Sequence, residues 1–307
     1  MKPRRSILSV PGHMEKMHRK ALPGVADVVM LDLEDSVPLD AKEAARDQVI
    51  RTLLAQTPGK RTIAVRINGI DSAMGYRDLL EVVTAAGERI ETVVVPKINH
   101  PGDIHFVDRL LTGIELHKKR ATPIGIEASI ETAEGMEQVS AIARASRRIR
   151  TLIFGIADYS ASVGARIVSI SGHGENEETI YPGHRWNYAL SRMVMAAKAN
   201  GAMAIDAPYG NFKDVDGLKR SAGMACALGC DGKWAIHPDQ IDTINQVFSP
   251  TEEEIQRAKM ILDADADARS RGMGAVAVDG RMVDQATVNL ARQLWEQAKQ
   301  LNPGAWF

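Results

Sequence analysis

Short apolar runs rich in β-branched residues alternate along the chain with longer segments that mix apolar and charged residues at helical spacing. This alternation is typical of βα units, in which parallel strands form one sheet and helices cover it. The sequence predicts eight strands, at Ser6–Val10, Asp27–Leu33, Thr62–Ile67, Thr92–Val95, Ile124–Ile130, Thr151–Phe154, Met203–Ile205 and Trp234–Ile236. Eight successive units predict an α/β protein with the (β/α)₈ TIM-barrel fold.

Helices are predicted between these strands, because apolar residues recur there every three or four positions beside charged residues. The expected ranges are Lys42–Leu54, Tyr76–Ala86, Ile104–Lys119, Ala133–Ala145, Trp186–Asn200, Gly217–Leu228 and Gln240–Phe248. The connection between Ala157 and Arg185 is long for a barrel loop and contains Gly, Ser and His residues. We therefore expect an active-site loop in that region.

A further helical segment follows Ser249-Pro250. Thr251 and Glu254 have the spacing of a capping box, which predicts a helix over Thr251–Arg271, and a final helix is predicted over Val283–Leu301. The predicted organisation is a TIM-barrel catalytic domain over residues 1–249 and a C-terminal appendage over residues 250–307.

Composition and charge exclude several classes of protein. Lys and Arg number 38 against 39 Asp and Glu, so the chain lacks the excess of positive charge expected of a general nucleic-acid or membrane-surface binder. Hydrophobic residues make up 45% and can fill a large core, whereas only two cysteines occur. No apolar run approaches the roughly 20 residues of a membrane span, and Ser6–Val10 is too short for a signal-peptide core. We expect a cytoplasmic protein without nucleic-acid or membrane partners.

Charged side chains follow almost every predicted strand. The residues are Asp32, Glu34, Asp35, Arg66, Lys97, Glu131, Asp158, Asp206 and His237. The carboxyl ends of barrel strands meet at one mouth, so these side chains are expected to converge there. Acids outnumber bases among them, and clustered carboxylates repel one another in a cleft of low dielectric constant unless a cation neutralises them.

Glu131 and Asp158 are the strongest candidates for metal ligands. Gly125, Glu127, Ser129 and Glu131 alternate along one strand, which places Glu131 on the inward face at the barrel mouth. Oxygen ligands without Cys or His at metal-binding spacing favour Mg²⁺, or Mn²⁺, over Zn²⁺. The alternative is that either acid caps the next helix, although Thr132 is also placed to cap the helix that follows Glu131. Both interpretations stay open.

Arg66 lies in a strand that is otherwise apolar, and a buried arginine must meet an anion. That anion is either a ligand or Glu34 or Asp35 in a structural ion pair, and Lys97 has the same two interpretations. Asp32, Glu34 and Asp35 are expected to divide between ion pairs with these bases and contacts to metal-bound water.

Motifs in a fixed order over nearly the whole chain resemble the citrate lyase β-subunit / malyl-CoA lyase family of the HpcH/HpaI aldolase superfamily. They are Val10-Pro11-Gly12, Lys20-Ala21, Leu31-Asp32-Leu33-Glu34-Asp35, Val65-Arg66-Ile67-Asn68, Val95-Pro96-Lys97, Ile130-Glu131-Thr132, Phe154-Gly155-Ile156-Ala157-Asp158, Ile236-His237-Pro238 and Val278-Asp279-Gly280-Arg281-Met282-Val283-Asp284. Residues 206–212 and 232–238 are most similar to the malyl-CoA lyase branch.

The resemblance implies a Mg²⁺-dependent carbon–carbon lyase. Its substrate would be a 3-hydroxyacyl-CoA such as malyl-CoA, cleaved reversibly to acetyl-CoA or propionyl-CoA and a 2-oxo acid such as glyoxylate. By position, Glu131 and Asp158 correspond to the metal ligands and Arg66 to the arginine that faces the thioester oxygen. Asp284 corresponds to the acid–base residue on a C-terminal lid that closes over a neighbouring subunit of a homo-oligomer, a trimer or hexamer. Glycines 272, 274 and 280 fit the hinge of such a lid.

Lys20 is the residue that matches the family's coenzyme A contact, and Lys97, Pro208 and His237 are further candidates for substrate contacts. His237 precedes Pro238, a pattern that also marks a turn and the start of a helix. Three alternatives stay open: the citryl-CoA lyase of a citrate lyase complex, a citramalyl-CoA lyase and a malyl-CoA thioesterase. The motif around Asp284 argues against a pyruvate aldolase that uses no coenzyme A. The presence of Arg66, Glu131, Asp158 and Asp284 together argues against a non-catalytic subunit, because a scaffold needs none of them.

Overall fold

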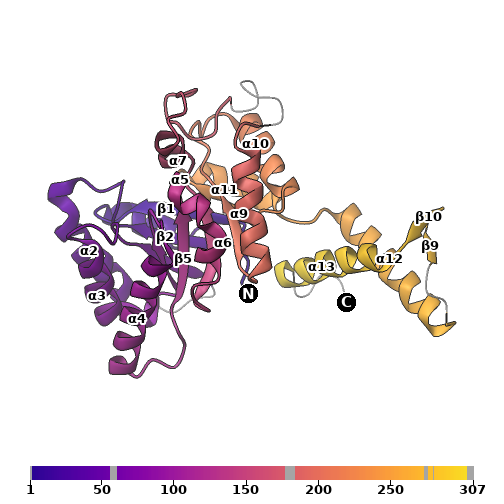
Figure 1. Cartoon of the computed structure of the whole chain (residues 1–307), viewed down its shortest axis with the longest axis horizontal. Coiled ribbons are helices and arrows are strands. Elements are labelled where there is room, and N and C mark those ends of the chain that lie inside the picture. The colour runs from indigo at the N-terminus through magenta and orange to yellow at the C-terminus, as the bar shows by residue number, and fades with distance from the viewer. Residues whose placement is uncertain (1, 56–60, 177–183, 273–275, 279, 303–307) are drawn as a thin grey trace. The chain divides into compact units, whose positions relative to one another are not determined.

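The computed structural model describes residues 2–55, 61–176, 184–272, 276–278 and 280–302 (Figure 1). The chain divides into two compact units, one over Arg4–Asn245 and one over Gln246–Phe307 together with Met1–Pro3. Among the described residues, no helix has both the length and the apolar character that crossing a membrane requires.

Eight parallel strands close into a barrel in the order in which they occur along the chain, which confirms the predicted fold. They are β1 (Ser6–Pro11), β2 (Val28–Asp32), β3 (Thr62–Arg66), β4 (Thr92–Val95), β5 (Gly125–Ile130), β6 (Ile149–Phe154), β7 (Met203–Asp206) and β8 (Gly232–Ala235). The pairing of β1 with β8, Ile7 opposite Trp234, closes the ring. Asp32 lies opposite Arg66 in the β2–β3 pair, so the register itself brings these two charges together.

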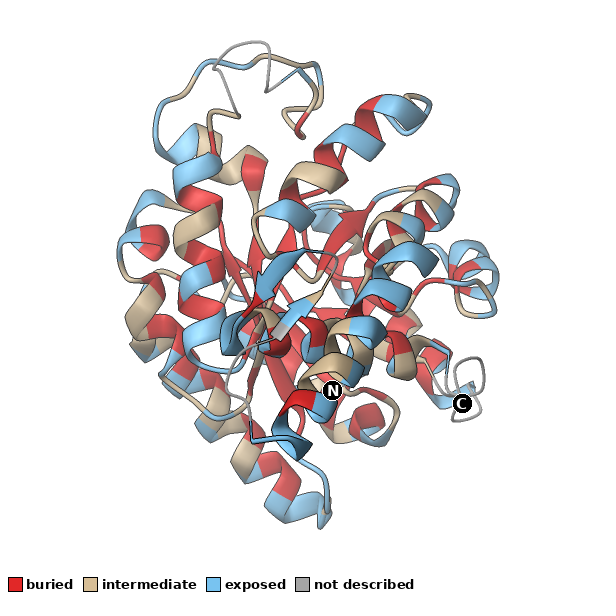
Figure 2. Ribbon diagram, turned by 90° about the vertical axis from the view of Figure 1, so that its right-hand side faces the viewer, coloured by how far each residue is buried: buried red, intermediate tan, exposed pale blue. Residues whose placement is uncertain are grey.

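Helices surround the strands, and Figure 2 shows that buried residues concentrate on the strands and on the inner faces of the helices. The barrel helices are α1 (Glu15–Ala21), α2 (Lys42–Ala55), α3 (Gly75–Ala86), α4 (Pro101–Lys118), α5 (Ala133–Glu137), α6 (Val139–Ala143), α7 (Ile156–Ser162), α9 (Asn187–Ala199), α10 (Val215–Ala227) and α11 (Ile241–Val247), with 3₁₀ turns η1 (Leu39–Ala41), η2 (Gly87–Arg89) and η3 (Pro238–Gln240).

Three helical predictions need correction. The helix predicted over Ala133–Ala145 is two short helices, α5 and α6, which meet at Gln138 because its ψ of 0° leaves the helical region. Helix α1 was not predicted, since seven residues without a side-chain cap give too little periodicity. Helix α7 occupies the start of the predicted loop, and residues 177–183 of that loop lie outside the described residues.

The barrel interior is apolar in its centre and charged toward the start of the strands. The apolar cluster consists of Ile7, Val28, Met30, Ala64, Val94, Ile153, Ile205 and Trp234. Glu127 is fully buried and accepts hydrogen bonds from Arg4 Nη1 (2.5 Å), from Thr151 Oγ1 (2.9 Å) and from Thr92 Oγ1. This network ties the segment before β1 to strands β4, β5 and β6.

The unit over Gln246–Phe307 contains α12 (Glu252–Ser270), an antiparallel hairpin of β9 (Val276–Val278) and β10 (Arg281–Val283), and α13 (Gln285–Leu301). The capping box of Thr251 and Glu254 is confirmed. The hairpin was not predicted, because strands of three residues are too short for a periodic signal, and α13 begins at Gln285 rather than at Val283. Gly272 and Gly280 have φ of 70° and 73°, while Gly274 lies outside the described residues.

We predict that Glu127→Ala destabilises the barrel by about 3–5 kcal/mol, because it leaves the Arg4 guanidinium buried without its counter-ion. Urea unfolding followed by circular dichroism measures the change. Glu134→Ala, at an exposed acid on α5, is the control and is expected to shift the free energy of unfolding by less than about 0.5 kcal/mol. Equal unfolding midpoints for the two variants would show that the Glu127 network contributes little.

Candidate active site

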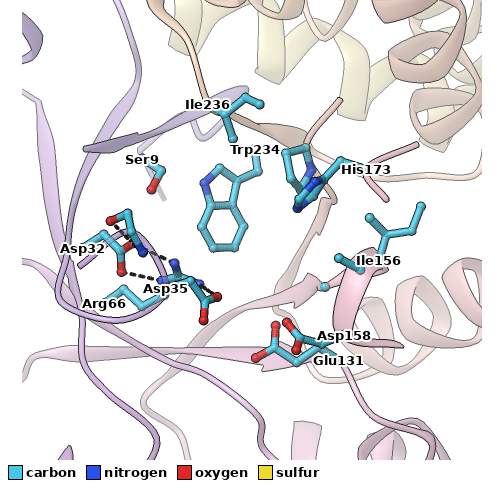
Figure 3. A pocket seen from close by; sticks show the side chains of 14 residues that line it. Ser9, Asp32, Asp35, Arg66, Glu131, Ile156, Asp158, His173, Trp234 and Ile236 are labelled. Carbon is cyan, nitrogen blue, oxygen red and sulfur yellow. Dashed lines mark hydrogen bonds and ion pairs between the residues drawn. The ribbon is translucent and has the colours of Figure 1, made fainter. Parts of the chain in front are cut away.

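A cavity of about 280 Å³ opens at the carboxyl ends of the strands (Figure 3). Its lining comes from the ends of β1, β2, β3, β5, β6, β7 and β8 and from the loop after α7. The lining residues are Ser9, Asp32, Asp35, Ser36, Arg66, Glu131, Gly155, Ile156, Ala157, Asp158, His173, Pro208, Trp234 and Ile236. The predicted convergence of strand-end side chains is therefore observed for Asp32, Asp35, Arg66, Glu131 and Asp158.

Arg66 is buried and anchored by two carboxylate oxygens of one partner. Its Nε donates to Asp32 Oδ1 (2.6 Å) and its Nη2 to Asp32 Oδ2 (2.7 Å), while Nη1 lies 2.9 Å from Glu34 Oε2 and 3.2 Å from Asp35 Oδ2. The guanidinium also lies over the Trp234 ring, 5.0 Å from its centroid. Burial raises the pKa of Asp32, but the Arg66 charge and its hydrogen bonds outweigh this and hold that pKa below its usual range.

The sequence named Glu34 and Asp35 as ion-pair partners of Arg66 and expected Asp32 to share in such pairs, and Arg66 contacts all three acids. Asp32 forms the two-pronged contact because it is the register partner of Arg66. A guanidinium has five N–H groups, and these contacts engage at most four of them. At least one N–H is therefore available to a ligand oxygen in the cavity. The structural ion pair and a contact to a ligand are thus compatible.

Glu131 follows β5 and is only 3% exposed. Its Oε1 accepts a hydrogen bond from the backbone N–H of Lys97 (2.7 Å). A Cβ atom at Gly155 would overlap the Glu131 carboxylate, so a glycine is required there for this side chain to reach the cavity. Burial raises the pKa of Glu131 to about 7, and the nearby negative charges of Glu34 and Asp158 add to the shift.

Neither candidate metal ligand caps a helix. Thr132 caps α5 by accepting a hydrogen bond from the N–H of Gly135 (2.9 Å), as the alternative in the sequence allowed. Asp158 is the third residue of α7, whose N-cap position holds Gly155 without a side-chain hydrogen bond. The capping interpretation of Glu131 and Asp158 is therefore wrong, and Figure 3 shows both carboxylates together at one edge of the cavity.

The ammonium of Lys97 connects acids that follow two different strands, β2 and β6. Its Nζ lies 2.7 Å from Glu34 Oε1, 3.8 Å from Asp35 Oδ1 and 3.9 Å from Asp158 Oδ1. Its backbone φ of 51° is left-handed, a conformation that is uncommon for residues other than glycine. Burial alone would lower the pKa of Lys97, but its hydrogen bond to Glu34 and the charge of that acid raise the pKa above its ordinary value.

Negative charge exceeds positive charge at this mouth. Five carboxylates, Asp32, Glu34, Asp35, Glu131 and Asp158, face Arg66 and Lys97, and the ammonium of Lys42, bound to the carbonyls of Leu33 and Glu34, is a third cation nearby. Burial is the main cause of the raised pKa of Glu131, and the negative charges of Glu34 and Asp158 add to it. Within the described ranges no three His, Cys, Asp or Glu side chains form a ready metal cluster, so the protein would supply only part of a coordination sphere. Two carboxylates completed by water and a ligand fit Mg²⁺, which keeps several waters in proteins.

The remaining predicted residues lie in different places. Pro208 lines the cavity, whereas Lys20 is exposed on α1. His237 caps η3 and stacks on Phe212 with ring centroids 4.4 Å apart, which matches the predicted start of a helix. Asp284 caps α13 by accepting a hydrogen bond from the N–H of Thr287 (2.8 Å), and the hydrogen bonds from Thr287 lower its pKa.

Sequence reasoning missed His173 and Trp234 as lining residues. His173 stands between Gly172 and Gly174, which have φ of 68° and 84°, and its carbonyl accepts a hydrogen bond from the N–H of Gly210 (2.8 Å). The two flanking glycines in a long loop were the available signal. Trp234 alternates with Gly232 and Ile236 along β8, so the period of two could have placed it on the inward face.

Known proteins are similar to this chain in sequence and in fold. The family model of the HpcH/HpaI aldolase/citrate lyase family matches residues 5–238. The chain is 37% identical to the L-malyl-CoA/beta-methylmalyl-CoA lyase of Cereibacter sphaeroides over 98% of its own length and 96% of that protein. It is 37% identical to the malyl-CoA/beta-methylmalyl-CoA/citramalyl-CoA lyase of Chloroflexus aurantiacus, with 97% and 87% covered.

Among solved structures, protein CitE of Mycobacterium tuberculosis in complex with magnesium, acetoacetate and coenzyme A superimposes with a TM-score of 0.76 and 29% identity. That match covers 96% of this chain and 98% of CitE. The family model covers most of the barrel, and the malyl-CoA lyases match over nearly the full chain. This protein belongs to the HpcH/HpaI aldolase/citrate lyase family.

Proposed function

We propose that the protein is a Mg²⁺-dependent lyase that cleaves a 3-hydroxyacyl-CoA such as malyl-CoA into acetyl-CoA or propionyl-CoA and a 2-oxo acid such as glyoxylate. The observation that carries the proposal is the placement of Arg66 and the pair Glu131 and Asp158 in one cavity, with negative charge in excess. Relatives named malyl-CoA lyases, and a neighbour that binds magnesium and coenzyme A, support the substrate class and the metal.

The chain's own residues divide the work of this reaction. In the cleavage the C3 hydroxyl of the acyl group loses its proton to water and becomes the 2-oxo carbonyl, the bond between C2 and C3 breaks, and the electron pair of that bond moves onto the thioester oxygen as an enolate. A free N–H of Arg66 would donate to that oxygen and stabilise a charge that the ground state lacks. Mg²⁺ held by Glu131 and Asp158 would polarise the hydroxyl that becomes the 2-oxo group. Asp284 would then give a proton to the acyl α-carbon.

The identity of the acyl group of the substrate is determined by an assay of a panel of thioesters. Malyl-, methylmalyl-, citramalyl- and citryl-CoA differ by a methyl or carboxymethyl group, which is worth about 1–3 kcal/mol of discrimination in an apolar pocket. Each thioester is incubated with enzyme and Mg²⁺, and the 2-oxo acid and free CoA are both measured. A 2-oxo acid without free CoA supports a lyase, free CoA indicates a thioesterase, and no turnover of any thioester by folded enzyme contradicts the proposal.

We predict that Glu131→Ala and Asp158→Ala each lower the rate of cleavage at least about 100-fold, because each removes an anionic ligand from the metal. Chelation by EDTA is expected to abolish wild-type activity, and Mg²⁺ or Mn²⁺ to restore it. Glu134→Ala on the exposed face of α5 is the control and keeps normal activity. Full activity of Glu131→Ala in the presence of the chelator would refute the metal site.

We predict that Arg66→Lys lowers kcat at least about 100-fold while KM changes by less than about threefold. The planar guanidinium can hold Asp32 with two N–H groups and still reach the enolate oxygen, which a compact ammonium cannot do. Steady-state kinetics of thioester cleavage measures both constants. Arg109→Lys, at an exposed arginine of α4, serves as the matched control. An unchanged kcat for Arg66→Lys would restrict Arg66 to the ion pair with Asp32.

Asp284→Asn separates the proposed acid–base role from the observed cap. Asparagine caps helices about as well as aspartate, so the hydrogen bond from the N–H of Thr287 and helix α13 should be retained. We expect this variant to lose exchange of the acetyl-CoA methyl protons with deuterated water, measured by NMR. Thr287→Val, which changes the cap surroundings but leaves the carboxylate, should keep that exchange. Normal exchange by Asp284→Asn would remove the residue from the mechanism.

The proposed lid acts on a neighbouring subunit of a homo-oligomer. Inactive Asp284→Asn and inactive Glu131→Ala subunits, mixed and allowed to exchange, would then form sites that combine an intact metal pair with an intact Asp284. We expect up to about a quarter of the wild-type activity from a random mixture of subunits. Mixed oligomers verified by mass spectrometry that stay inactive would contradict a lid acting between subunits.

A further inference from the structure

Lys97 contacts the candidate metal site through both its main chain and its side chain. The backbone N–H donates to Oε1 of Glu131 (2.7 Å), and the ammonium lies 3.9 Å from Oδ1 of Asp158. The next residue, Ile98, donates its N–H to the carbonyl of Ser129 (3.2 Å) and so fixes the end of β4 against β5. Lys97 therefore contacts both acids of the pair, Glu131 and Asp158, from the segment that directly follows β4.

The left-handed backbone of Lys97 is part of this arrangement. A non-glycine residue at a φ of 51° is disfavoured, and such conformations persist where surrounding contacts hold them. One contact of this backbone is the hydrogen bond from its N–H to Glu131, which involves no atom of the Lys97 side chain. The effect of the ammonium can therefore be tested separately from the effect of the main chain.

The two cations of the site differ in how their charge is used. Arg66 is matched to Asp32 by two short hydrogen bonds, at 2.6 and 2.7 Å. Arg66 also reaches Glu34 and Asp35, at 2.9 and 3.2 Å. The Lys97 ammonium is shared among Glu34 at 2.7 Å, Asp35 at 3.8 Å and, at 3.9 Å, Asp158 of the candidate metal pair, and its side chain is 35% exposed. A divalent cation at Glu131 and Asp158 would meet repulsion from this ammonium at close range.

We propose that Lys97 is an internal counter-ion that weakens the binding of the divalent cation by holding positive charge against the same group of carboxylates. The inference rests on the proposed function, because it takes Glu131 and Asp158 as the metal ligands. Lys97 is thereby a positioning and charge-balancing residue of the metal site. If it has this role, removal of the ammonium raises the affinity of the protein for the divalent cation. Structural damage to the site would produce the opposite change.

The experiment measures binding of Mn²⁺ to the purified full-length protein by isothermal titration calorimetry, without substrate. Lys97→Met removes the charge and keeps most of the side-chain volume, and Lys97→Gly removes the charge with a residue that suits a φ of 51°. Both variants are expected to lower the Kd for Mn²⁺ at least tenfold. Lys97→Arg, which keeps the charge, should stay within about threefold of the wild type.

Lys119→Met is the matched control. Lys119 also has a left-handed backbone, with a φ of 55°, but it is exposed at the C-terminal end of α4, away from the acids of the barrel mouth. This variant should leave the Kd for Mn²⁺ unchanged. Circular dichroism confirms that each variant is folded, and Lys97→Gly carries the test if Lys97→Met does not fold.

The outcomes distinguish this inference from the proposed function. An unchanged or higher Kd in the folded charge-removal variants would overturn the counter-ion role of Lys97 and leave the proposed metal site intact. A wild-type protein that binds no Mn²⁺, or that binds it equally well after Glu131→Ala, would overturn the proposed metal site and the inference with it.

Discussion

The excess of carboxylate at the barrel mouth is the constraint on which the rest of the site depends. Parallel strands bring Asp32, Glu131 and Asp158 to the same end of the barrel, where Asp32 and Glu131 are buried and Asp158 is 43% exposed, so repulsion is strongest at the two buried acids. The protein offsets this repulsion only in part. Arg66 balances Asp32, Lys97 is shared among several acids, and Glu131 is left with its pKa raised to about 7. The excess of negative charge at the barrel mouth favours the binding of a cation, either free or bound to a substrate.

Residues next to the acids take over structural tasks and so leave the acids free. Thr132 caps α5 in place of Glu131, and Gly155 begins α7 and leaves room for the Glu131 carboxylate. The Lys97 main chain supplies the hydrogen bond that orients that carboxylate. Glu127 lies four residues before Glu131, within β5. Its carboxylate is paired with neighbouring side chains and therefore needs no ligand. Glu127 within β5 is thus a paired structural acid, whereas Glu131, directly after β5, lines the cavity and accepts a hydrogen bond from the Lys97 main chain.

How much of this the sequence could reveal follows from the range of each signal. The strand and helix periods predicted the barrel, and the rule that strand ends converge predicted that Arg66, Glu131 and Asp158 would meet. The geometry of the pairing was harder to predict, because the two-pronged contact of Arg66 falls on Asp32 through the register between β2 and β3, which neighbouring residues do not encode. His173 and the β9–β10 hairpin lie in short irregular segments whose placement depends on contacts distant in sequence.

The charged residues of the cavity and the residues of its other walls would contribute differently to substrate specificity. In the proposed function, Arg66, Glu131 and Asp158, which line one cavity, would face groups that every candidate thioester shares and would favour the reaction without choosing the acyl group. His173, Pro208 and Ile236 line the same cavity with an imidazole and two apolar surfaces. Contacts of that kind discriminate by a methyl or carboxymethyl group, and only to the extent of about 1–3 kcal/mol each. Substrate choice can therefore change through these walls while the charge arrangement, and the chemistry it supports, stays the same.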